Sequence, residues 1–191
     1  MEKLSSEQSE TSDRVLEFDL SAELRHGIAV SNLAYALSKE LGLPHEQCYD
    51  LAIAGMLHDI GKLKLRSYIN GQESNPMVIE ELKYVRMHST LGYEELKDQG
   101  YSDFVLESIL YHHENYDGSG YPSNLAGKEI PIGARILRVC DVFCALSQER
   151  SYRKAFDKHT VMESMIDEIK NFDLEVFLAF QRVVHASQAG K

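Results

Sequence analysis

The sequence predicts an all-α fold, and two observations support it. Apolar residues recur at three- and four-residue steps in most segments between residues 20 and 186, and no segment alternates apolar and polar residues as a half-exposed strand does. The length of 191 residues suits one domain with a sizeable core. We therefore expect one helical domain over residues 14–187, preceded by a flexible tail or linker remnant over residues 1–13 that is rich in Ser and Glu.

The first two helices are predicted from apolar spacing and from the residues that end them. The helical pattern runs from Ser21 to Leu41, where Gly42 and Pro44 stop it. A second helix is expected from about His45 to His58.

The middle of the chain predicts two further helices separated by loops. The pattern lapses between Lys64 and Pro76 and resumes from Val78 to Leu96. Ser102 is the predicted N-cap of a helix that leads into His112 and His113.

A loop with three glycines, from Asp117 to Pro131, precedes the last three predicted helices. Pro131 suits the first turn of the next helix, in which Cys140 and Cys144 stand one turn apart on the apolar side. We expect both thiols to be packed in the core. Two amphipathic helices follow, to about residue 186.

Composition excludes several classes of protein. The formal net charge is −10, which argues against a long nucleic acid or an anionic membrane as partner. No apolar run approaches the roughly 18 residues of a membrane span, so we expect a soluble cytoplasmic protein. Three cysteines without a CxxC pair do not support a disulfide framework.

The candidate functional residues are histidines and acids on separate predicted helices. His58 and Asp59 are adjacent, and Lys62 lies one turn further on. An isolated His-Asp pair is usually an ordinary surface or capping pair, but here five more candidate ligands accompany it: His26, His88, His112, His113 and Asp141. Helical bundles build metal sites from such inward-facing side chains, and mixed imidazole and carboxylate ligands suit Mn, Fe, Zn or Co better than Mg or Ca.

Four stretches together resemble a known family. They are LHDIGKL (57–63), MHSTLGYEEL (87–96), ILYHHENYDGSGYPSNLAGKEIPIGARILRVCD (109–141) and ALSQERSYR (145–153). Over about residues 20–185 the sequence resembles the HD-GYP domains, a group of HD phosphohydrolases in bacteria. The resemblance implies an HD-domain helical bundle with a glycine-rich GYP loop, which is the loop from Asp117 to Pro131 that contains Gly120, Tyr121 and Pro122. It also implies hydrolysis of the second messenger cyclic di-GMP to linear pGpG; whether the reaction continues to GMP is open at this stage.

The resemblance also implies roles for individual residues. The implied metal ligands are His26, His58, Asp59, His88, His112, His113 and Asp141. Asp59 would bridge two divalent transition-metal ions, iron or manganese in the first place, with zinc, cobalt or nickel as alternatives. Asp59 and Lys62 are the implied catalytic residues. Substrate contacts are implied for Lys62, Tyr121, Arg150 and Arg153, the two arginines holding the second phosphate.

The sequence departs from the family pattern before the first histidine. Relatives that bind three metals have a glutamate four residues before the first histidine, where this sequence has Ala22, with Glu23 one residue out of phase. We therefore expect a two-metal centre.

Arg135 is open between a structural ion pair and a substrate contact. We expect His45, His159 and His185, which lie outside every motif, to be ordinary surface or capping residues.

Two alternative functions remain open at this stage. One is hydrolysis of another cyclic dinucleotide such as cyclic GMP-AMP, because no residue of the sequence decides which base is bound. The other is a weakly active receptor that docks diguanylate cyclase or other signalling domains through the GYP loop. A homodimer is compatible with each of these functions.

Overall fold

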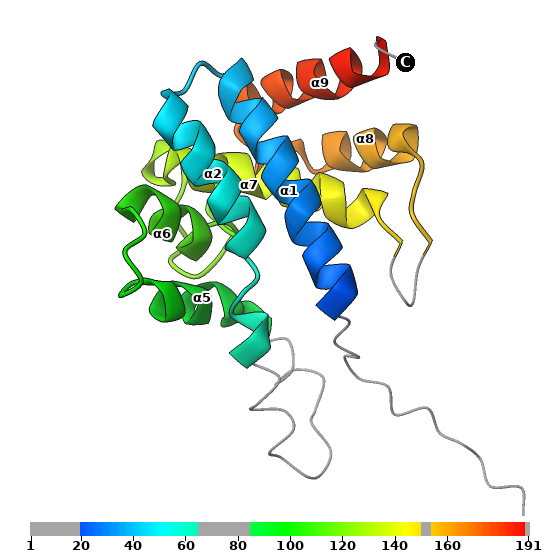
Figure 1. Cartoon of the computed structure of the whole chain (residues 1–191). Coiled ribbons are helices and arrows are strands. Elements are labelled where there is room, and N and C mark those ends of the chain that lie inside the picture. Colours follow the sequence, from blue (N-terminus) through cyan, green and yellow to red (C-terminus); the bar gives the residue numbers. More distant parts are fainter. Residues whose placement is uncertain (1–19, 65–84, 150–153, 190–191) are drawn as a thin grey trace, which may run out of the picture.

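The structure, a computed structural model, describes residues 20–64, 85–149 and 154–189 (Figure 1). These ranges contain helices and no strand, so the all-α prediction is confirmed. The predicted tail over residues 1–13 and the first part of the predicted 78–96 helix, residues 78–84, lie outside them. The helices are α1 (Leu20–Glu40), α2 (His45–Leu57), α5 (His88–Leu96), α6 (Asp103–Leu110), α7 (Ile132–Ser147), α8 (Lys158–Asp167) and α9 (Leu174–Ala189), with short 3-10 helices η1 (Gly127–Glu129) and η2 (Ile169–Asn171).

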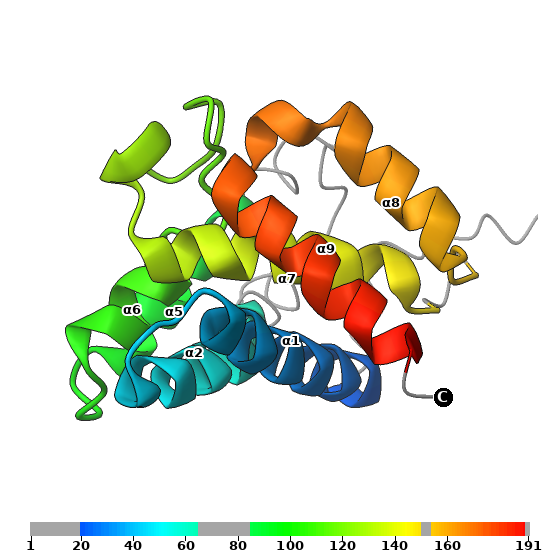
Figure 2. The same cartoon turned by 90° about the horizontal axis from the view of Figure 1, so that it is seen from above.

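Helix α7 lies at the centre of the bundle. It packs against α1, α2 and α6 on one side and against α8 and α9 on the other (Figures 1 and 2). Its apolar face explains this position, because Ile136, Leu137 and Val139 are fully buried. Cys140 and Cys144 are buried free thiols on the same helix, as predicted for core residues.

Sequence signals at the helix ends are mostly confirmed. The Ser102 hydroxyl accepts a hydrogen bond from the Val105 N–H (3.3 Å) and caps α6, which satisfies one of the free N–H groups of the first turn. Pro131 is the N-cap of α7 and lies just before its first turn, one position earlier than expected. The 3-10 helix η1 inside the glycine loop was not predicted, because three residues are too few for a periodic pattern.

Arg135 resolves as a structural residue. Its Nη1 donates to Asp173 Oδ2 (2.6 Å) and its Nε donates to the Ile130 carbonyl (2.9 Å), which ties α7 to the start of α9. His45, His159 and His185 are exposed, in agreement with their predicted surface positions. None of the helices in the described ranges is both long and apolar enough to cross a membrane.

Candidate metal centre

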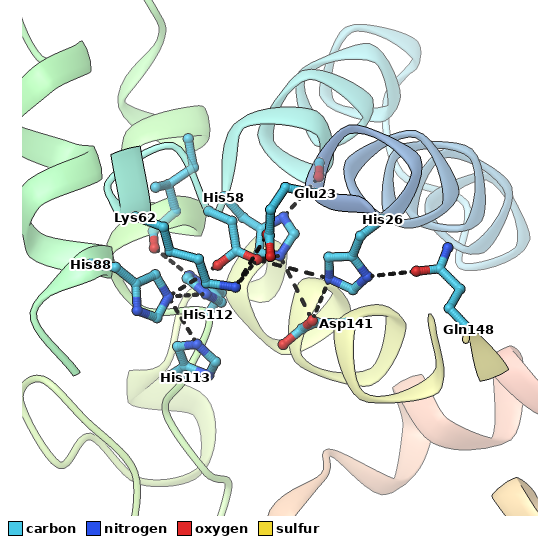
Figure 3. Close-up of polar contacts among 12 residues, drawn as sticks. Glu23, His26, His58, Lys62, His88, His112, His113, Asp141 and Gln148 are labelled. Carbon is cyan, nitrogen blue, oxygen red and sulfur yellow. Dashed lines mark hydrogen bonds and ion pairs between the residues drawn. The ribbon is translucent and has the colours of Figure 1, made fainter. Parts of the chain in front are cut away.

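Seven side chains from five parts of the bundle converge at one place (Figure 3). His26 comes from α1, His58 and Asp59 follow α2, and His88 begins α5. His112 and His113 follow α6, and Asp141 lies on α7. We call His26, His58 and Asp141 the acidic half of the centre, and His88, His112 and His113 the histidine half; Asp59 lies between them.

Three of the histidines share one hydrogen-bond pattern. The ring Nδ1 of His58 donates to the Gly55 carbonyl (2.8 Å), that of His88 to Val85 (2.5 Å) and that of His112 to Ile109 (2.6 Å), each three residues earlier. A carbonyl can only accept, so each Nδ1 carries the proton. In the neutral ring the Nε2 lone pair then points into the centre, as a metal ligand requires.

His26 reaches the same orientation by a different route. It lies inside α1, and its Nδ1 lies 3.2 Å from Oε1 of Gln148, the residue that ends α7. The Gln148 amide in turn donates to the Arg25 carbonyl (3.4 Å). Because the amide oxygen only accepts, this contact favours a proton on Nδ1 of His26, and Nε2 faces Asp141 Oδ1.

Asp59 joins the two halves. Its Oδ2 lies 3.2 Å from Nε2 of His58, and its Oδ1 lies 3.3 Å from Nε2 of His88. Asp141 completes the acidic half, with Oδ1 2.9 Å from Nε2 of His26 and 3.7 Å from Nε2 of His58. The two oxygens of Asp59 thus face different halves, Oδ2 the acidic half and Oδ1 the histidine half, which is the arrangement a bridging ligand needs.

The two halves differ in their electrostatics. Burial lowers the pKa of His58, but the carboxylates of Asp59 and Asp141 outweigh it and raise that pKa to about 10. Burial disfavours the charged form of both carboxylates, yet neighbouring groups, His58 above all for Asp59, hold their pKa values well below the usual range. In the histidine half, burial lowers the pKa of His113 to about 3, and it also lowers the pKa values of His88 and His112.

Lys62 lies beside the acidic half, between two carboxylates. Its Nζ is 2.6 Å from Asp59 Oδ2 and 3.4 Å from Glu23 Oε2 (Figure 3). Burial lowers the pKa of Lys62, but Asp59 and Glu23 outweigh it and raise the value, so the ammonium keeps its charge. Glu23 precedes His26 by three residues and shares its helix face, which brings the carboxylate to the centre although it is out of phase with the family's glutamate.

Two glycines allow the backbone around the centre to approach closely. A Cβ on Gly61 would meet the carbonyl of His88, so the turn after Asp59 can lie against α5 only without a side chain there. A Cβ on Gly120 would meet the backbone of Glu114 and Asn115. This close approach brings the GYP loop onto the segment that carries the histidine half.

Tyr121 covers the histidine half. Its ring stacks on the His113 ring, with centroids 4.8 Å apart and an interplanar angle of 28°, and its N–H donates to the His113 carbonyl (3.2 Å). The buried Glu114 accepts from the Ser123 N–H (2.6 Å) and holds the loop from below. Tyr121 therefore lies over the histidine half, and its contact with substrate stays a prediction.

The structure brings together all the predicted ligands, Lys62 and Tyr121. Arg150 and Arg153 lie outside the described residues. Sequence reasoning did not assign a role to Gln148, and it judged Glu23 to be misplaced. The three-residue spacing from Glu23 to His26 was an available signal, whereas no local signal links Gln148 to a histidine 122 residues away.

The donor atoms fit bound metal ions. Nε2 of His58 is buried and makes no hydrogen bond of good geometry to the described residues, although the carboxylates of Asp59 and Asp141 lie 3.2 and 3.7 Å away. Nε2 of His88 lies 3.3 Å from Nε2 of His112 and 3.1 Å from Nε2 of His113. Since Nδ1 carries the proton in His88 and in His112, two lone pairs face each other, and a cation between them would relieve that repulsion.

These features first define a class: an all-α domain with a histidine-rich centre that could hold two metal ions bridged by an aspartate. The family model described as "HD domain" matches residues 5–176. The chain therefore belongs to the HD domain family, and the predicted resemblance to its HD-GYP members is confirmed.

Several relatives within this family are phosphodiesterases. The chain is 36% identical over 160 residues to the cyclic di-GMP phosphodiesterase PA4108 of Pseudomonas aeruginosa, a match that covers 83% of this chain and 38% of the relative. It is 37% identical over 157 residues to the 3'3'-cGAMP-specific phosphodiesterase 1 of Vibrio cholerae, covering 80% and 36%. The chain thus spans under two fifths of the length of these curated relatives.

A solved structure has the same fold. Bd1817, described as an HDG"Y"P protein from Bdellovibrio bacteriovorus, superposes with a TM-score of 0.68 at 22% identity, covering 85% of this chain and 52% of that one.

Proposed function

We propose that the chain hydrolyses a phosphodiester bond of a cyclic dinucleotide, with cyclic di-GMP as the substrate and linear pGpG as the first product. The observation that carries this proposal is the convergence of five histidines and two aspartates, in which Asp59 turns one oxygen to each half. Relatives that share this family act on cyclic dinucleotides by name.

The residues of the chain would divide the work as follows. His26, His58 and Asp141 would hold one divalent ion and His88, His112 and His113 the other, with Asp59 shared. Two such ions, when bound, lower the pKa of water and stabilise charge on phosphoryl oxygens. We propose iron or manganese, with zinc, cobalt or nickel as alternatives, because imidazole and carboxylate donors suit these metals.

Lys62 would act on the substrate directly. Asp59 and Glu23 hold its ammonium beside the acidic half, where it would stabilise negative charge on a phosphate oxygen. The same ammonium is a proton donor within reach of the centre for the departing sugar oxygen. Tyr121 would line the opposite side of the bound nucleotide, over His113.

Cyclic GMP-AMP is the second candidate substrate. The observation in its favour is the 37% identity to a Vibrio cholerae phosphodiesterase named as specific for 3'3'-cGAMP. Docking of diguanylate cyclase domains on the GYP loop, a homodimer and a cytoplasmic location stay predictions from the sequence.

Product analysis tests this proposal. The protein is loaded with manganese or iron and incubated separately with cyclic di-GMP, 3'3'-cGAMP and cyclic di-AMP, and the products are identified by liquid chromatography and mass spectrometry. We expect pGpG from cyclic di-GMP, and no product after chelation. A linear product from 3'3'-cGAMP alone would move the substrate to the second candidate. Binding without any linear product would leave a receptor and would contradict hydrolysis.

A further inference from the structure

Arg138 is a cation on the helix that carries Asp141, and it has no ion-pair partner among the described residues. It lies on α7, one helical turn before Asp141, and is half-buried. Its Nε donates to Oδ1 of Asn115 (3.0 Å), two residues after His113. Its guanidinium also lies 6.0 Å from the Phe172 ring centroid. No ion pair and no other hydrogen bond joins it to another described residue, so its two terminal amino groups are without a partner there.

Arg135, on the same helix, is bound differently from Arg138. Arg135 is paired with Asp173 at 2.6 Å and also bonds a backbone carbonyl, so its hydrogen-bonding capacity is largely used within the fold. Among the described residues, Arg138 is held by a single hydrogen bond from Nε to Asn115. The two terminal amino groups of Arg138 therefore keep their N–H donors available for a ligand.

The charge of Arg138 lies near the histidine half. Arg138 lies on α7 one turn before Asp141, and Asn115, which holds its Nε, lies two residues after His113. Burial lowers the pKa of Arg138 itself, and Asp141, Tyr121 and Glu168 oppose that change; the guanidinium keeps its proton. A fixed positive charge beside a centre that would hold two divalent ions is unfavourable unless an anion joins them.

We propose that Arg138 binds a phosphate oxyanion of the substrate on the His113 side of the centre, an inference that rests on the proposed function. A guanidinium presents two parallel N–H donors that match a phosphate, which a lysine ammonium does not. A phosphate is favoured over a base edge because hydrogen bonds from a guanidinium to an anion are stronger than those to a neutral group. Lys62 and Arg138 then meet phosphate charge from the two ends of the centre, Lys62 at the acidic half and Arg138 at the histidine half.

The test uses Arg138→Gln and Arg138→Lys in the manganese-loaded protein. For Arg138→Gln we expect KM for the cyclic dinucleotide and the inhibition constant of inorganic phosphate to rise by about tenfold or more, as for loss of a charge-assisted contact. Arg138→Lys should show a smaller rise, because it keeps the charge and loses the fork. Asn115→Ala, which releases Nε, should also raise KM by less than Arg138→Gln does. Arg182→Gln is the matched control, since Arg182 is an exposed arginine on α9 that pairs with Glu40.

Metal affinity separates this role from a structural one. Removing a repelling charge should leave manganese binding unchanged or tighter in Arg138→Gln, whereas damage to the fold would weaken it. Unchanged KM and unchanged phosphate inhibition in both Arg138 variants would overturn the inference, as would weaker manganese binding with unchanged phosphate inhibition. If the unaltered protein turns over no cyclic dinucleotide, the proposed function fails, and phosphate binding measured by calorimetry still decides the role of Arg138.

Discussion

The acidic half and the histidine half of the centre present similar ligand atoms in different electrostatic surroundings. Around the acidic half, the negative charges of Asp141 and of the shared Asp59 are balanced by a proton on His58 and by the ammonium of Lys62. In the histidine half, three buried rings hold lowered pKa values, and the carboxylate nearest to them is the shared Asp59. The comparison shows that charges within the acidic half compensate one another, whereas the histidine half brings the Nε2 atoms of two neutral rings, His112 and His113, to within 3.3 Å of Nε2 of His88.

The largest effect should come from the residue common to both halves. Asp59→Ala should lower manganese affinity and phosphodiesterase activity by at least about 100-fold, because even residues that only orient metal ligands cost 10- to 100-fold. Metal content after gel filtration and product formation measure this. Asp98→Ala, at an exposed position beyond α5, is the control and should behave as the unaltered protein. Retention of both ions in Asp59→Ala would show that the halves are independent.

Single-ligand variants should separate the halves. We expect His26→Ala to lose the ion of the acidic half and keep the other, and His113→Ala to do the reverse, so each falls from two bound ions to one. Elemental analysis gives the count, and paramagnetic broadening by manganese of NMR signals near each half shows which ion remains. Loss of both ions in each variant would mean that the two halves bind as one unit.

A smaller effect is expected at Gln148, which orients His26 alone. Gln148→Leu removes the acceptor for Nδ1, so the ring can take the other tautomer, and manganese affinity of the acidic half should fall by about tenfold. Gln148→Glu keeps an acceptor at that place and should restore binding. Equal losses in both variants would argue that Gln148 acts through packing between α1 and α7.

The smallest effect concerns pH in the chelated protein. Unfolded histidines take up protons near pH 6.5, whereas His88, His112 and His113 have lowered pKa values in the fold, to about 3 for His113. Their contribution to stability is present above pH 6.5 and is lost as the pH falls toward 3. His58 acts oppositely, with stability present below pH 6.5 and lost as the pH rises through about 10.

The three histidines with lowered pKa values lose more stability on acidification than His58 gains, so acidification should destabilise the metal-free protein. Its melting temperature should drop by about 5 °C between pH 7.5 and 5.5, measured by calorimetry. A rise in melting temperature over the same interval would contradict the neutral state of the histidine half.

Much of the site could be predicted because several of its metal-ligand candidates are adjacent residues in short sequence motifs. His58 with Asp59, and His112 with His113, are adjacent in the sequence, and helical periodicity places each pair near a helix end. The helices themselves follow from apolar spacing and from caps such as Ser102.

The rest depends on contacts that no local pattern contains. Gln148 meets His26 across 122 residues, and Asn115 orients Arg138 across 23. Arg135 could not be assigned from sequence because its partner, Asp173, is 38 residues away. Such pairs become visible only when the packing of α1, α7 and the GYP loop is known.

Anomalous X-ray diffraction from manganese-loaded crystals would test the central claim most directly. The account predicts two strong anomalous peaks, one among His26, His58 and Asp141 and one among His88, His112 and His113, with an oxygen of Asp59 on each. A single peak shared by all the histidines, or peaks found only on the protein surface, would contradict it.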